Sequence, residues 1–61
     1  MKKSFGDRLI YYMHYKEIHA WQLAELTGIP FEDIEHYMLN DKRPDAETRQ
    51  KLADALNIKE I

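Results

Sequence analysis

The sequence predicts an all-α fold, a compact domain of four to five helices. Three observations lead to this prediction. Apolar residues recur at helical spacing in several stretches, no stretch alternates apolar and polar residues over the length of a strand, and residues typical of helix ends separate these stretches. Of the 61 residues 44% are apolar, and only two are Gly and two are Pro. This composition is typical of a folded chain, so a single domain is expected over residues 1–61.

The first helix is predicted over Phe5–Lys16. Ser4 can cap its N-terminus, and Asp7 adds an acidic side chain to the first turn, where the positive end of the helix dipole favours it. The apolar residues at helical spacing are Phe5, Leu9, Tyr12 and Met13.

Two short helices follow, over about 20–27 and about 31–38. Gly28 suits the left-handed conformation that often ends a helix, and Pro30 suits the start of the next one. The second of these helices has acidic residues in its first turn and an apolar stripe made by Ile34, Tyr37 and Met38.

A polar stretch, 40–44, ends in Pro44 and predicts a loop before a fourth helix capped by Asp45. Leu52, Ala53 and Leu56 give that helix its apolar side. Asn57 tolerates a left-handed conformation, and residues 59–61 could begin a fifth helical turn.

The stretch from Leu23 to Ile29, followed by Ile34, indicates a helix-turn-helix. A small residue at Ala24 and a turn at Gly28 let two short helices pack steeply against each other. From about Phe5 to Ile58 the sequence resembles the lambda-repressor/Cro-like family, also called the XRE family. Later segments match in the same order: Lys42-Arg43-Pro44, Glu47-Thr48, Lys51-Leu52-Ala53 and Ala55-Leu56.

This resemblance implies a lambda-repressor-like domain that acts as a sequence-specific DNA-binding regulator of transcription, a phage or bacterial repressor or Cro-like protein. Such a domain would bind double-stranded DNA as a homodimer, with the helix 31–38 in the major groove. The implied base contacts are Phe31 to a thymine methyl, Glu32 to a cytosine amino group and His36 to a base or phosphate. Glu35 need not face the bases. The implied phosphate contacts are Lys2, Lys3, His19, Lys42 and Arg43.

Three of the departures from the family pattern are at Met13, Met38 and Ala20. Many members have an Arg and a Glu, paired and largely buried, where this chain has Met13 and Met38. Because apolar side chains can replace a buried ion pair at little cost, we expect these two methionines to touch in the core. A family glutamine that anchors phosphate is replaced by Ala20.

Charge weighs against DNA binding, since the formal net charge is −2 and the helix 31–38 has three acidic residues and no Lys or Arg. If Lys2, Lys3, Lys42 and Arg43 neutralised four phosphates, the salt slope would be about −3.6 per subunit.

The alternative is a protein-interaction or oligomerisation module on the same fold, with reduced or lost DNA binding. Its basis is a surplus of apolar side chains at positions that the family usually leaves polar: Ile10, Tyr11, Tyr15 and Trp21. Tyr11 and Tyr15 are four residues apart and so share a helix face. A simpler explanation is that these aromatic side chains extend a thin core.

Other functions find no support in the sequence. A nucleophile beside a base, a glycine-rich phosphate loop and a cofactor motif are all missing, so an enzyme is not expected. His14, His19 and His36 match no zinc spacing. The sequence has no apolar run long enough for a signal peptide or a membrane span, and it has no Cys, which agrees with a cytoplasmic protein.

Overall fold

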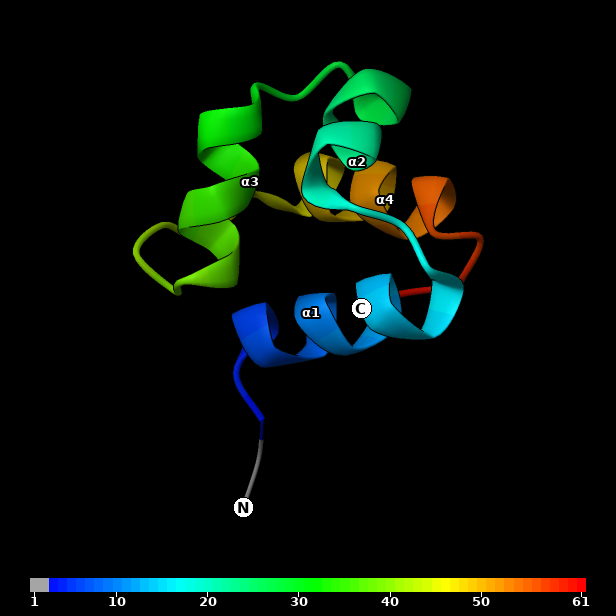
Figure 1. Cartoon of the computed structure of the whole chain (residues 1–61). Coiled ribbons are helices and arrows are strands. Elements are labelled where there is room, and N and C mark those ends of the chain that lie inside the picture. The colour runs from blue at the N-terminus through cyan, green and yellow to red at the C-terminus, as the bar shows by residue number, and fades with distance from the viewer. Residues whose placement is uncertain (1–2) are drawn as a thin grey trace.

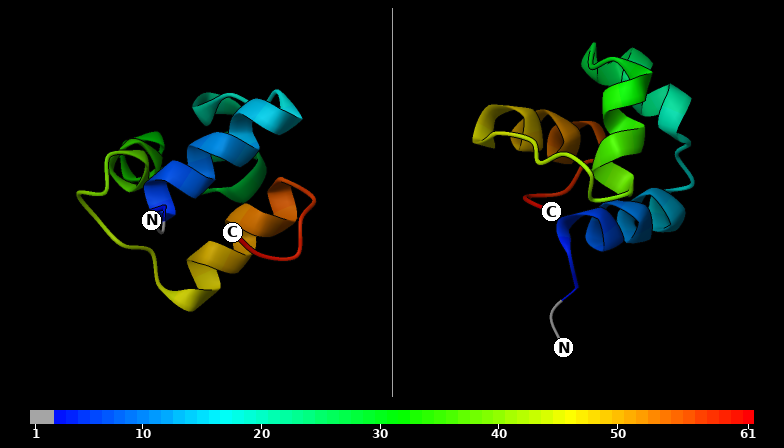
Figure 2. Two further views of the ribbon diagram at one scale, coloured as in Figure 1. Left: turned by 90° about the horizontal axis from the view of Figure 1, so that it is seen from below. Right: turned by 90° about the vertical axis from the view of Figure 1, so that its left-hand side faces the viewer.

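The computed structural model describes residues 3–61 and is all-helical over that range, which confirms the predicted class. Its elements are α1 (Phe5–Lys16), α2 (Ala20–Thr27), α3 (Phe31–Met38) and α4 (Ala46–Ala55). The bounds of the first three coincide with the ranges expected from the sequence. Figure 1 shows α1, α2 and α3 around a common centre with α4 behind them, and Figure 2 shows the same arrangement from below and from the side of α3.

The expected fifth helical turn does not form within the described residues. Asn57 adopts φ 59°, a left-handed conformation that ends the α4 region and turns the chain back. Ile58 and Ile61 are then partly buried against the core instead of starting another helix. The prediction for residues 59–61 is therefore wrong, because packing of these two isoleucines determines the path of the chain end.

The helix ends follow the predicted capping. Ser4 Oγ accepts the N–H of Asp7 at 3.2 Å, and the Asp45 carboxylate accepts the N–H of Thr48 at 2.8 Å. Gly28 has φ 77°. The end of α1 was not anticipated: Glu17, a residue with a Cβ, takes the left-handed conformation with φ 55°.

Each helix contributes to one core. Its fully buried large side chains are Leu9, Leu23, Ile34, Leu52 and Leu56. On α3, Ile34 and Tyr37 point into this core, which fixes the rotation of the helix about its axis and so determines which residues face outward.

Candidate nucleic-acid interface

The outward side of α3 contains the three residues predicted to contact bases. Phe31 is 43% exposed, and Glu32 and His36 are also exposed. The Gly28–Pro30 turn sets this helix after α2, and Pro30 occupies the N-cap with φ −55°. Because Ile34 and Tyr37 anchor the inner side, the three candidates are brought together on one surface.

Two further residues belong to the same surface. Successive helical residues turn by about 100°, which places residue 35 and residue 39 between the predicted contacts. Glu35 is exposed, and Leu39 is 68% exposed. Glu35, which was expected only not to need to face the bases, therefore lies on the outward side of α3. The helical spacing 31, 35, 39 was the signal in the sequence that could have identified both.

Lys42, a predicted phosphate contact, is engaged by α3 itself. Its Nζ lies 2.9 Å from Asp33 Oδ1. The hydrogen bond to that carboxylate raises the pKa of the Lys42 ammonium above its ordinary value. A second contact of this kind joins His36 Nδ1 to Asp41 Oδ2 at 3.2 Å. The loop after α3 thus folds back along the helix, and Lys42 neutralises the charge of Asp33.

The other predicted phosphate contacts lie at separate places. Lys3 is exposed, with Nζ 5.6 Å from the centroid of the Tyr11 ring, and Lys2 lies outside the described residues. His19 is the N-cap of α2, and its backbone N–H donates to Gln22 Oε1 at 2.7 Å. Arg43 is exposed in the loop between α3 and α4.

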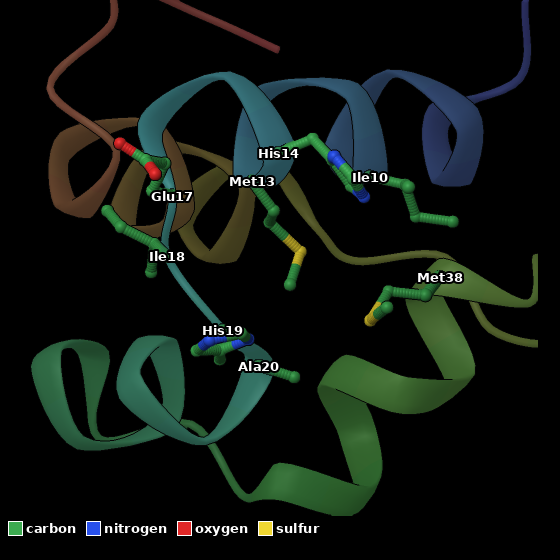
Figure 3. A pocket seen from close by; sticks show the side chains of 8 residues that line it. All are labelled: Ile10, Met13, His14, Glu17, Ile18, His19, Ala20 and Met38. Atoms are coloured by element: carbon green, nitrogen blue, oxygen red, sulfur yellow. The ribbon is translucent and has the colours of Figure 1, made fainter.

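The three departures from the family pattern meet at one pocket of about 530 Å³ between α1, α2 and α3. Met13, Met38 and Ala20 all line it, and Figure 3 shows the two methionines pointing into it from different helices. Met13 is 6% exposed and Met38 is half-buried, so neither side chain is turned out into solvent. Their direct contact stays a prediction. The short side chain of Ala20 helps to keep the pocket open.

The predicted protein-interface residues are all exposed. The Tyr11 and Tyr15 rings are stacked with centroids 6.2 Å apart, and Lys16 Nζ lies 5.7 Å from the centroid of the Tyr15 ring. Trp21, on α2, is 55% exposed, and Ile10 lines the methionine pocket. Within the described residues, ring contacts join Tyr11 to Tyr12 and Tyr15 but do not include Trp21.

Two arginines were not assigned a role from the sequence. Arg8 on α1 and Arg49 on α4 line a pocket of about 240 Å³ together with Arg43. No helical spacing connects the three positions, so only the tertiary fold could bring them together.

Residues 3–61 contain no group of three metal-ligating side chains that could hold an ion. None of the described helices combines the length and the apolar character needed to cross a membrane. No protein-family model, no curated protein and no solved structure matches this chain.

Proposed function

We propose that the protein is a sequence-specific DNA-binding regulator of transcription with a lambda-repressor/Cro-like helix-turn-helix, in which α3 enters the major groove. The main support is the exposed surface of α3. A short helix with a buried inner side presents Phe31, Glu32 and His36 outward, directly after the tight turn at Gly28. A major groove about 12 Å wide admits a helix presented in this way.

The chemistry of this surface indicates what it can recognise. Carboxylates only accept hydrogen bonds when ionised, so Glu32 and Glu35 fit the amino groups that cytosine and adenine expose in the major groove. Phe31 and Leu39 provide apolar contacts for thymine methyl groups. Recognition would therefore depend on base donors and methyl groups, and guanine acceptors would be disfavoured.

Affinity has to come from cations beside α3, because the helix itself repels phosphate. In the described residues, Lys3 and Arg43 are exposed and form no ion pair, whereas Lys42 is paired with Asp33. A homodimer that places two α3 helices on a two-fold related site would double the few phosphate contacts of one chain. A phage or bacterial regulator of this kind would act in the cytoplasm.

The test begins with selection from a random duplex library, followed by titration of the selected DNA at about 50 and about 200 mM salt. Saturable binding that weakens with salt is expected. Glu32→Gln should change the selected sequence. Glu47→Gln is the matched control, since Glu47 is also exposed in the first turn of a helix. Absence of saturable binding at low salt would refute the proposal.

A second candidate is a protein-interaction or oligomerisation module, favoured by the exposure of Tyr11, Tyr15 and Trp21. Large aromatic side chains are enriched in protein interfaces. Sedimentation of the wild type and of Trp21→Ala distinguishes the two functions. A self-association that Trp21→Ala abolishes, in a chain that binds no DNA, would favour this candidate.

A further inference from the structure

All three arginines of the chain line a single pocket, although they are far apart in the sequence. Arg8 belongs to α1, Arg43 to the loop between α3 and α4, and Arg49 to α4. The pocket has a volume of about 240 Å³, and Phe5 and Pro44 form the rest of its lining. No Asp or Glu lines it. Three positive charges therefore converge in a chain whose formal net charge is −2.

The acidic residues of the protein do not neutralise this cluster. In the described part of the chain, the close contacts between basic side chains and carboxylates are those of Lys42 with Asp33 and of His36 with Asp41, and neither includes an arginine. Arg8 Nη1 donates to the backbone carbonyl of Lys3 at 2.6 Å, a neutral acceptor that orients the guanidinium and leaves its charge uncompensated. The cluster thus keeps its positive charge.

Asp45 lies at the end of this loop, directly before α4, and its carboxylate is engaged there. It accepts the backbone N–H of Thr48 at the start of α4. Hydrogen bonding to Thr48 is the main reason why the pKa of Asp45 lies below its ordinary value, and Lys51 and then Arg49 add smaller electrostatic contributions. Arg49 thus interacts with Asp45 only electrostatically, and within the described residues it forms no ion pair with the Asp45 carboxylate.

We propose that Arg8, Arg43 and Arg49 form a binding site for a phosphate group. A guanidinium is planar and presents several N–H donors in a fixed geometry that matches two oxygens of a phosphate. Phosphate has enough oxygens to accept from more than one arginine. Convergence of three like charges without a carboxylate costs energy in the free protein, and a bound anion relieves that repulsion.

The DNA backbone is the source of phosphate that follows from the proposed function, and this part of the inference rests on it. In the right-hand view of Figure 2, the loop after α3 crosses from the end of α3 to the start of α4, and the N-terminal end of α1 lies beneath this loop. A helix seated in the major groove has phosphates along its flanks. The arginine pocket would bind one of them, a contact that the paired Lys42 is less free to make.

The first experiment uses inorganic phosphate, which needs no DNA sequence. Two-dimensional NMR of the arginine Nε–H groups should show the three signals shifting together and saturating during the titration. Arg49→Gln should weaken binding at least about tenfold, as expected for loss of hydrogen bonds to a charged group. Lys51→Gln, which removes the same charge two residues along α4, should leave binding nearly unchanged. Arg49→Lys keeps the charge and should still weaken binding, because it loses the bidentate geometry.

The second experiment compares the same variants on duplex DNA. Arg43→Gln and Arg49→Gln should each reduce the salt slope by about 0.9, and Lys51→Gln should not. If phosphate binds but the arginine variants do not change the salt slope of DNA binding, the site is supported and its ligand is free phosphate. Phosphate binding in a chain that binds no DNA would refute the proposed function and leave the site standing. Arginine signals that do not respond to phosphate, with equal DNA slopes for Arg49→Gln and Lys51→Gln, would overturn the inference.

Discussion

Gly6 of α1 donates its backbone N–H to Oδ1 of Asn40, 2.9 Å away, across 34 residues of sequence. Nδ2 of Asn40 donates in turn to Ser4 Oγ at 2.9 Å. Asn40 has φ 62°, so a left-handed residue after α3 directs its side chain to the start of α1. These contacts fix the first turn of α1 to the C-terminal end of α3, and so they help to fix the position of α3.

Gly6→Ala should destabilise the protein. A Cβ at Gly6 would lie 2.6 Å from the carbonyl oxygen of Tyr37 and 2.7 Å from that of Met38. These are backbone atoms of α3, so the two helices would have to separate. Overpacking of this kind costs about 1–3 kcal/mol, which we expect in urea unfolding monitored by circular dichroism. An effect below about 0.5 kcal/mol would show that the helices adjust freely at this junction.

Asn40→Gly should also destabilise, although glycine accepts the left-handed conformation more readily than asparagine. The variant loses both side-chain hydrogen bonds and leaves the Gly6 N–H without this partner, a loss of about 1–3 kcal/mol. Asn57→Gly is the matched control, because Asn57 has φ 59° and no recorded side-chain hydrogen bond in the described residues. The two variants are compared by thermal unfolding. Equal melting temperatures would mean that only backbone conformation matters at Asn40.

The sequence predicted helix ends better than contacts between helices. Ser4, Gly28 and Asp45 act through neighbours within a few residues, so residue type and spacing reveal their roles. The sequence identified Asn40 only as a polar loop residue. Its contact with α1 could not be predicted, because its partner Gly6 lies 34 positions away.

The candidate site shows the same limit. Helical spacing places Phe31, Glu32 and His36 on one side of α3. The pairing of Lys42 with Asp33 depends on how the loop folds back, which no local pattern specifies. The convergence of the three arginines depends on the relative positions of α1, α4 and the loop between α3 and α4, which only the tertiary fold determines.

Acid should weaken the cap of α4. The Asp45 carboxylate accepts a hydrogen bond from the Thr48 N–H, and this bond lowers the pKa of Asp45 below its ordinary value of 3.8. The charged carboxylate therefore stabilises the fold above that ordinary value, and this stabilisation is lost as the pH falls through the lower pKa of the folded state. Asp45→Asn keeps a side-chain acceptor without the charge. Its melting temperature should be lower than that of the wild type at neutral pH, and the gap should narrow as the pH falls below 3.8. Asp54→Asn, near the other end of α4, is the control. A gap that does not change with pH would contradict this role of the charge.

Asp33→Asn should increase the affinity for DNA. Asp33 holds the Lys42 ammonium at 2.9 Å, so Lys42 must give up this partner before it can contact a phosphate. Removing the carboxylate returns the pKa of Lys42 toward its ordinary value and frees its donors. Because exposed ion pairs are weak, the gain should be about two- to fivefold, with a salt slope steeper by about 0.9.

The same substitution also removes a negative charge near DNA, and the Lys42→Gln background separates the two effects. In that background, Asp33→Asn should give a smaller gain in affinity than it gives in the wild type, because no ammonium is left to release. Fluorescence anisotropy at two salt concentrations measures all of these affinities. If Asp33→Asn gave the same gain with and without Lys42, the ion pair would not compete with DNA, and the effect of Asp33 would be simple repulsion of the backbone.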